Sequence, residues 1–233
     1  TQLYGERMIV ANATGCSSIY GGSAPSTPYC KHKESGHGPA WANSLFEDNA
    51  EYGFGFAEGI HAQRERIAVI MEEALKNGAS EAEKEAFTEW LSGRSNAEAS
   101  VNATAKVKAA IAGSESSYAK EISKLSQYLV KKSIWVFGGD GWAYDIGYGG
   151  LDHALASGRN INILVLDTEV YSNTGGQASK STPRGAVAKF ASDGKKLSKK
   201  NLGLMMTTYG NAYVASVNMG MDREKTALAF VEA

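Results

Sequence analysis

One stretch, residues 133–173, constrains the fold more than any other part of the chain. It opens with the apolar run Ser-Ile-Trp-Val-Phe at 133–137 and continues through Gly-Gly-Asp-Gly at 138–141 into a helix-like segment at 143–157. A second apolar run follows at 161–166. Strand, glycine loop, helix and strand make a βαβ unit with a right-handed crossover. Its two strands end at the same edge of the sheet, where α/β proteins bind ligands.

Asp140 and Thr168 stand just past the ends of these two predicted strands. Two oxygen ligands from different loops can therefore converge on one cation. Glycines permit the close backbone approach that a diphosphate needs, and Mg²⁺ takes one or two protein oxygens beside phosphate oxygens. Asp-Gly is also a common turn pair, so Asp140 alone would be equally compatible with a simple turn. The strand before it and the Thr168 loop favour a metal–diphosphate site.

Four longer strings carry a resemblance to a known family. Gly-Asp-Gly at 139–141 with the 167–173 loop resembles the Mg²⁺–thiamine diphosphate motif of thiamine-dependent enzymes. The strings at 139–147, 168–177, 13–21 and 38–48 more closely resemble pyruvate:ferredoxin (flavodoxin) oxidoreductases, and the likeness covers nearly the whole chain.

The resemblance implies roles for individual residues. Asp140, Thr168 and the main-chain carbonyl of Val170 would ligate Mg²⁺, and Asn173 would reach the diphosphate or the reacting carbon. Many thiamine enzymes have Asn where Thr168 stands, whereas this oxidoreductase family has Thr. The residues that the resemblance places around the cofactor are Gly139, Asp140, Gly141, Trp142, Thr168, Glu169, Val170, Tyr171, Ser172 and Asn173, with Ile19 and Phe46 around the thiazolium ring. A plain core role for Ile19 and Phe46 is the alternative.

Cys16 is the one predicted iron–sulfur ligand of the chain. By resemblance it binds a [4Fe–4S] cluster, whose other ligands would lie before Thr1 and after Ala233. From the residues alone, a small buried apolar role is the alternative. Cys30 matches no ligand and is interpreted as structural. Two cysteines make no disulfide framework, which favours a reducing cytoplasm.

Composition limits the partners. The hydrophobic content is 43%, the charged content 21% and the formal net charge −1, so nothing indicates nucleic-acid binding. No apolar run reaches the roughly 18 residues of a membrane span. The chain starts at Thr1 without Met and stops at Ala233 inside a helical pattern, so we expect an internal piece of a longer polypeptide.

Before residue 133 the sequence predicts a strand at 7–12 and then loops at 13–22 and 21–40. A long helix at 45–76 is expected to be capped by Asn43-Ser44. Three glycines in its first half, Gly53, Gly55 and Gly59, suggest close packing against backbone or cofactor. A helical insert over about 79–132 comprises helices at 81–91, 96–111 and 117–130, the first opened by a Ser80–Glu83 capping box.

After residue 173 the sequence predicts a Ser-, Lys- and Gly-rich loop to about 200. A short helix at 202–209, a strand at 213–217 and a final helix capped by Asp222 follow. A run of lysines, Lys195, Lys196, Lys199 and Lys200, is interpreted as a solvated loop, with docking of an acidic ferredoxin as the weaker alternative. The predicted fold is α/β, a mostly parallel doubly wound sheet with the helical insert, in a single thiamine diphosphate/Mg-binding domain over residues 1–233.

The reaction is inferred from the resemblance. It implies oxidative decarboxylation of pyruvate with coenzyme A to acetyl-CoA and CO₂, with electrons passing through iron–sulfur clusters to ferredoxin or flavodoxin. The other implied partners are the remaining domains of the same polypeptide and a second copy in a homodimer. This piece alone should be inactive, because the activating acid and the substrate arginine normally come from the N-terminal part. The alternatives are another 2-oxoacid:ferredoxin oxidoreductase, a non-oxidative thiamine enzyme, or a non-catalytic phosphate-binding or interaction module.

Overall fold

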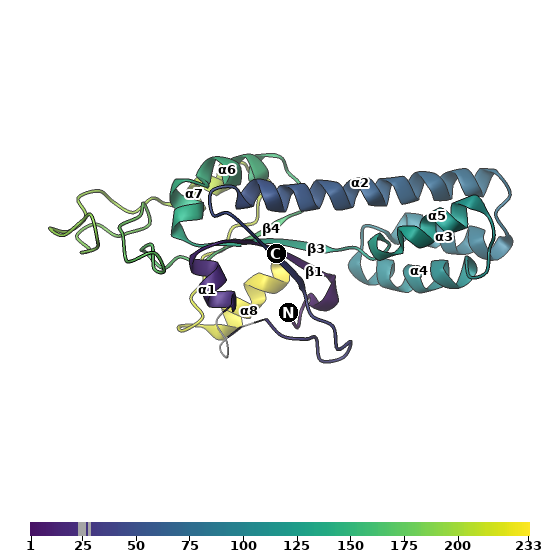
Figure 1. Cartoon of the computed structure of the whole chain (residues 1–233), viewed down its shortest axis with the longest axis horizontal. Coiled ribbons are helices and arrows are strands. Elements are labelled where there is room, and N and C mark those ends of the chain that lie inside the picture. Colours follow the sequence, from purple (N-terminus) through teal and green to yellow (C-terminus); the bar gives the residue numbers. More distant parts are fainter. Residues whose placement is uncertain (23–26, 28) are drawn as a thin grey trace. The chain divides into compact units, whose positions relative to one another are not determined.

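The computed structural model describes residues 1–22, 27 and 29–233 (Figure 1). Part of the 21–40 loop expected from the sequence lies outside the described residues. The helices and strands, in chain order, are β1 (Met8–Ala13), α1 (Cys16–Gly22), β2 (Ala40–Ser44), α2 (Asn49–Lys76), α3 (Glu81–Gly93), α4 (Ala97–Ala110), α5 (Ser117–Lys124), β3 (Ser133–Gly138), α6 (Tyr148–Ala156), β4 (Asn162–Val165), α7 (Leu202–Thr207) and α8 (Arg223–Glu232). None of the described helices is both long and apolar enough to cross a membrane.

The chain packs as two compact units. The sheet unit comprises Thr1–Gly55 and Ile134–Ala233, and the helical unit comprises Phe56–Ser133. The helical unit thus begins inside α2, whereas the sequence suggested an insert starting near residue 79. The description of the chain as one domain carrying an insert stays a prediction.

The sheet has the strand order β2-β1-β3-β4. β1 runs parallel to β2. β3 runs parallel to β4, as the predicted βαβ unit over residues 133–173 requires. The tips of β1 and β3 share one edge, because a Cβ added to Gly139 would lie 2.7 Å from the Cβ of Cys16. The carboxyl ends of the strands therefore converge, which confirms the predicted parallel α/β fold.

Helices cover both faces of this sheet (Figure 1). On one face Trp135 and Phe137 pack with Met8 and Val10, and the Phe230 ring of α8 lies 5.8 Å from Trp135. Val136 faces the other way, and α2 approaches it through Gly53. Successive side chains of β3 thus point to opposite faces of the sheet and pack in an apolar layer on each, as expected for a strand buried on both faces. The doubly wound arrangement is confirmed.

The predicted loop at 13–22 is wrong, because Cys16–Gly22 forms helix α1. Its small polar residues suggested a loop, yet here they stabilise the first turn. The Ser17 hydroxyl donates to the carbonyl of Ala13, and the Ser18 hydroxyl accepts from the N–H of Gly15. Serine side chains can satisfy free backbone groups at a helix start, so a serine-rich segment is compatible with a helix there.

Three further boundaries differ from expectation. Residues 40–44 form β2, so Ser44 ends a strand and does not cap α2, which starts at Asn49. α5 ends at Lys124, short of the predicted 130, and a 3₁₀ turn follows. Residues 213–217 form no strand. An apolar run becomes a strand only beside an edge that accepts its hydrogen bonds, and Tyr213 and its neighbours are largely exposed instead.

The helical unit has its own core, to which α2, α3, α4 and α5 all contribute. The Ser80–Glu83 capping box is confirmed at the start of α3. Arg64 in α2 donates to the carbonyls of Leu129 and Arg94 and lies over the Trp90 ring, so one guanidinium joins three segments.

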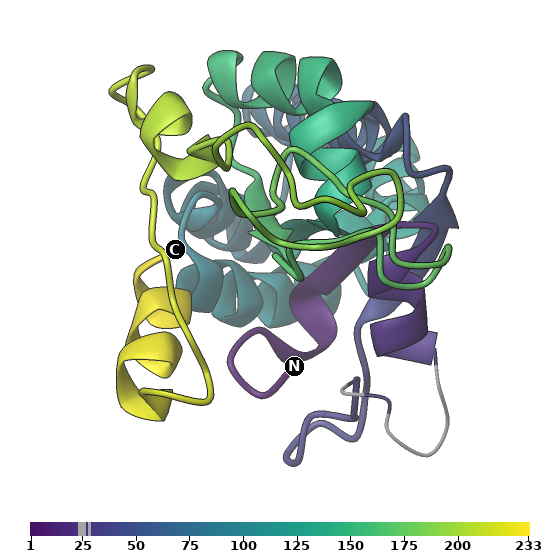
Figure 2. The same ribbon diagram turned by 90° about the vertical axis from the view of Figure 1, so that its left-hand side faces the viewer.

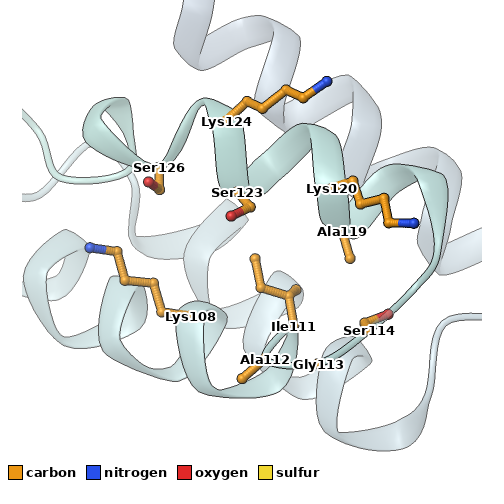
Figure 3. A pocket seen from close by; sticks show the side chains of 10 residues that line it. All are labelled: Lys108, Ile111, Ala112, Gly113, Ser114, Ala119, Lys120, Ser123, Lys124 and Ser126. Atoms are coloured by element: carbon orange, nitrogen blue, oxygen red, sulfur yellow. The ribbon is translucent and has the colours of Figure 1, made fainter.

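A cavity of about 530 Å³ opens between the end of α4 and α5. Figure 3 shows that Lys108 points to the left and Lys120 and Lys124 to the right, so these three lining side chains do not converge on one point. None of the predicted site residues lines it.

Candidate functional site

All the predicted site residues lie in the sheet unit, past the ends of its strands. β1 leads to Cys16 and Ile19, β2 to Phe46, β3 to 139–142 and β4 to 168–173. Because parallel strands deliver their carboxyl ends to one edge, residues far apart in the sequence gather there. Among the described residues, no group of three or more His, Cys, Asp or Glu is placed to hold a metal. The predicted magnesium site uses one carboxylate, one hydroxyl and one carbonyl instead.

Asp140 lies two residues past β3 and is fully buried. Its Oδ1 accepts a hydrogen bond of 3.1 Å from the N–H of Thr168, and its Oδ2 accepts one of 3.4 Å from the Ser179 hydroxyl. Burial, and then the charge of Asp167, raise the pKa of Asp140 to about 7, although the N–H groups of Thr168 and Val170 oppose the rise. A carboxylate buried in this way is stabilised by a nearby cation.

The three predicted Mg²⁺ ligands form a connected group. Besides its backbone contact with Asp140, Thr168 donates a hydrogen bond from its hydroxyl to the carbonyl oxygen of Val170, and these two oxygens lie 3.0 Å apart. Adjacent ligands of an octahedral Mg²⁺ with bonds of about 2.1 Å lie about 3.0 Å apart. The residue between them, Glu169, has φ +64°, a left-handed conformation that is rare for a side chain of this kind. The predicted residues therefore fit a magnesium site.

Two glycines of the motif lie beneath larger side chains. A Cβ on Gly141 would lie 2.3 Å from the Tyr171 ring, and one on Gly139 would lie 3.2 Å from the Cys16 sulfur. The Cys16 thiol donates to the Oδ1 of Asn173 at 3.4 Å. The predicted cluster ligand and the predicted catalytic amide thus meet above the glycine loop, although 157 residues separate them.

Other predicted residues are less closely joined to this group. The indole of Trp142 is buried, and a Cβ on Gly138 or Gly147 would overlap it, so its ring packs in the interior of the sheet unit. Ile19 on α1 is 56% exposed. Phe46 is half-buried in the turn before α2. Ser172 is exposed beside Asn173. The cofactor roles of these residues stay predictions.

Sequence analysis missed the residues that hold the loop after β4. Asp167 accepts hydrogen bonds from the hydroxyls of Tyr144 and Ser181 and from the Lys199 ammonium, 2.7 Å away. Burial raises its pKa, but these three partners outweigh burial and hold the pKa below its ordinary value. Lys199 also pairs with Glu169 at 3.0 Å. The only signal in the sequence was the density of Ser and Lys after residue 178.

Residues 178–200, which we call the strap, run across the strand ends (Figure 2). The interpretation of their lysines as solvated is wrong for three of the four. Lys195 donates to two strap carbonyls, Lys199 pairs with two carboxylates, and Lys200 lies over the ring of a tyrosine. Of these four lysines, only Lys196 is exposed. The run of lysines in the sequence does not show which ammonium groups form contacts within the protein.

Comparison with known proteins agrees with this geometry. Residues 109–233 match the family described as "Thiamine pyrophosphate enzyme, C-terminal TPP binding domain". Across its whole length the chain is 55% identical to the pyruvate:ferredoxin oxidoreductase of Moorella thermoacetica. It is 57% and 53% identical to the pyruvate-flavodoxin oxidoreductases of Trichormus variabilis and Klebsiella pneumoniae. It covers 20% of the length of each of these relatives.

The matched segment contains β3, the glycine loop, β4 and the strap, so the family match and the converging oxygens concern the same part of the molecule. It also covers more than half of the chain. The chain therefore belongs to the thiamine pyrophosphate enzymes, as a C-terminal TPP binding domain.

Proposed function

We propose that this chain anchors thiamine diphosphate through one Mg²⁺ held by Asp140, Thr168 and the carbonyl of Val170. The observation that carries the proposal is the grouping of these three ligands at the strand ends, with two oxygens 3.0 Å apart. Gly139 and Gly141 leave room for Cys16 and Tyr171 to pack against the glycine loop of the proposed site, because neither glycine has a Cβ.

The remaining predicted residues complete the proposed site. When bound, thiamine diphosphate supplies the electron sink for decarboxylating a 2-oxoacid. Asn173 would present its side-chain amide to the diphosphate or to the reacting carbon. Glu169, Tyr171 and Ser172 would lie in the loop that surrounds the diphosphate, and the buried Trp142 would support the glycine loop from the interior. Ile19 and Phe46 would pack around the thiazolium ring.

The full protein, we further propose, oxidises pyruvate with coenzyme A to acetyl-CoA and CO₂ and passes electrons to ferredoxin or flavodoxin. The names of the relatives support this reaction. Cys16 is the proposed ligand of a [4Fe–4S] cluster, whose other thiolates would come from the rest of the polypeptide. Its 3.4 Å contact with Asn173 would place the cluster beside the cofactor, which favours an oxidative over a non-oxidative reaction. A homodimer in the cytoplasm is the proposed setting, and the chain alone would be inactive.

Thermal stabilisation by thiamine diphosphate and Mg²⁺ tests the anchor. In the full-length protein, the two ligands together should raise the melting temperature, and Asp140→Asn should abolish the rise because it removes the only charged ligand. Asp193→Asn is the matched control, since Asp193 is exposed on the strap. Equal stabilisation of the Asp140→Asn variant and the parent would refute the proposed site.

A further inference from the structure

The strap supplies several of the side-chain contacts that fix the loop after β4. Three of its hydroxyl residues, Ser179, Ser181 and Thr182, donate to Asp140, to Asp167 and to the carbonyl of Glu169. The strap also supplies one ammonium group to this loop, that of Lys199.

Lys199 holds both sides of Thr168. Its Nζ lies 2.7 Å from the Oδ2 of Asp167 and 3.0 Å from the Oε1 of Glu169, the residues directly before and after that threonine. The Lys199 side chain is about one-third exposed, and its two partners come from a single turn. The Lys199 ammonium therefore holds together the two residues that flank Thr168, the proposed magnesium ligand.

The turn at Glu169 is stabilised by contacts from outside the loop. Glu169 adopts φ +64°, a left-handed conformation that is unfavourable for a residue with a side chain. Its carbonyl accepts a hydrogen bond of 2.6 Å from Thr182, and its carboxylate binds Lys199. The reversal at Glu169 is what brings the hydroxyl of Thr168 and the carbonyl of Val170 within 3.0 Å.

We propose that Lys199 is a positioning residue for the cation site, which it acts on through Asp167 and Glu169 without being a ligand. This inference rests on the proposed function. Charge alone would act in the opposite direction, because removing an ammonium near a cation site strengthens the attraction for Mg²⁺. The sign of the change therefore separates positioning from simple electrostatics.

The test is a Mg²⁺ titration of the full-length protein with saturating thiamine diphosphate, followed by thermal stabilisation and not by turnover. Lys199→Met should raise the half-saturating Mg²⁺ concentration about 10- to 100-fold, the usual effect of removing a residue that orients a metal ligand. Lys199→Arg keeps a donor for both carboxylates and should stay within about threefold of the parent. Lys196→Met, an exposed lysine of the same strap, should match the parent.

Unchanged or tighter Mg²⁺ binding in Lys199→Met would overturn the inference while leaving the proposed function intact. Absence of any Mg²⁺ effect in the parent would instead refute the proposed function, and the inference with it. Should Lys199→Met fail to fold, Lys199→Gln removes the ammonium charge and leaves an amide N–H donor for one of the two carboxylates. This variant should raise the half-saturating Mg²⁺ concentration about 3- to 10-fold. Losing one of two equal contacts removes half of the free energy, which corresponds to the square root of the roughly 10- to 100-fold change. No rise in that variant would also overturn the inference.

Discussion

At the scale of single residues, Asp140 is the most unusual group in the described chain. It is fully buried, and no lysine or arginine pairs with it directly among the described residues. The nearby ammonium, that of Lys199, is engaged with Asp167 and Glu169. A buried carboxyl that lacks its own counter-charge destabilises the fold when it ionises. This cost is consistent with a residue retained for binding a cation.

Asp140 should make the cofactor-free chain less stable as pH rises. Its pKa is raised from 3.8 to about 7, first by burial and then by Asp167. Because the folded pKa exceeds the unfolded one, the stabilising effect is complete below about pH 4 and is lost as pH rises toward 7. Asp140→Asn should therefore be more stable than the parent at pH 8, on the order of a few kcal/mol.

Urea unfolding at pH 8 and pH 5 checks this prediction. The stability difference between Asp140→Asn and the parent should shrink by about half or more at pH 5. Asp193→Asn, which changes an exposed carboxylate, serves as the control. A difference that is the same at both pH values would show that the carboxyl does not titrate in this range.

The sequence could predict Asp140 and Thr168, because both follow recognisable strands of a βαβ unit. It could not predict that Ser181 and Lys199 bind Asp167. Those contacts depend on the path of the strap, which contains no regular helix or strand and so leaves no periodic pattern. The left-handed turn at Glu169 was equally hidden, since glutamate gives no signal for that conformation.

At the scale of elements, α2 shows how glycines of one helix can differ. All three glycines of its first half were expected to pack closely. A Cβ on Gly53 would lie 2.3 Å from Val136 and 3.3 Å from Ala11, whereas Gly55 and Gly59 have nothing within 4 Å. Gly53 therefore packs closely, against side chains of β3 and β1, whereas Gly55 and Gly59 have no close neighbour among the described residues, and their packing against a cofactor stays a prediction.

Alanine at Gly53 and at Gly55 should have opposite effects on stability. Gly53→Ala would push α2 away from the sheet, and overpacking of this kind costs about 1–3 kcal/mol, more than the roughly 1 kcal/mol that a helix gains from Gly→Ala. Gly55→Ala meets no neighbour, so it should stabilise the chain by up to about 1 kcal/mol. Urea unfolding midpoints measure both. A stabilising Gly53→Ala would contradict the packing described here.

Elements with strong periodic or capping signals were predicted well. The two strands of the βαβ unit, α3 with its capping box, and the caps of α7 and α8 were all expected. The errors fall where tertiary pairing decides. Residues 40–44 become a strand because β1 lies beside them, whereas residues 213–217, which are richer in apolar residues, remain unpaired.

At the scale of the whole molecule, the proposed chemistry belongs to one unit only. The sheet unit contains all the predicted site residues, and the helical unit contains none. The chain spans about a fifth of the length of the relatives it matches. One cysteine cannot hold a [4Fe–4S] cluster, so the cluster proposed at Cys16 is testable only in the full-length protein.

Locating the cation itself tests the central claim most directly. Crystals of the full-length protein grown with thiamine diphosphate and Mn²⁺, an anomalous scatterer that replaces Mg²⁺ at oxygen sites, would give its position. The claim predicts one anomalous peak within about 2.3 Å of a carboxylate oxygen of Asp140, the hydroxyl of Thr168 and the carbonyl of Val170. A diphosphate-bound Mn²⁺ that contacts none of these three oxygens would contradict it.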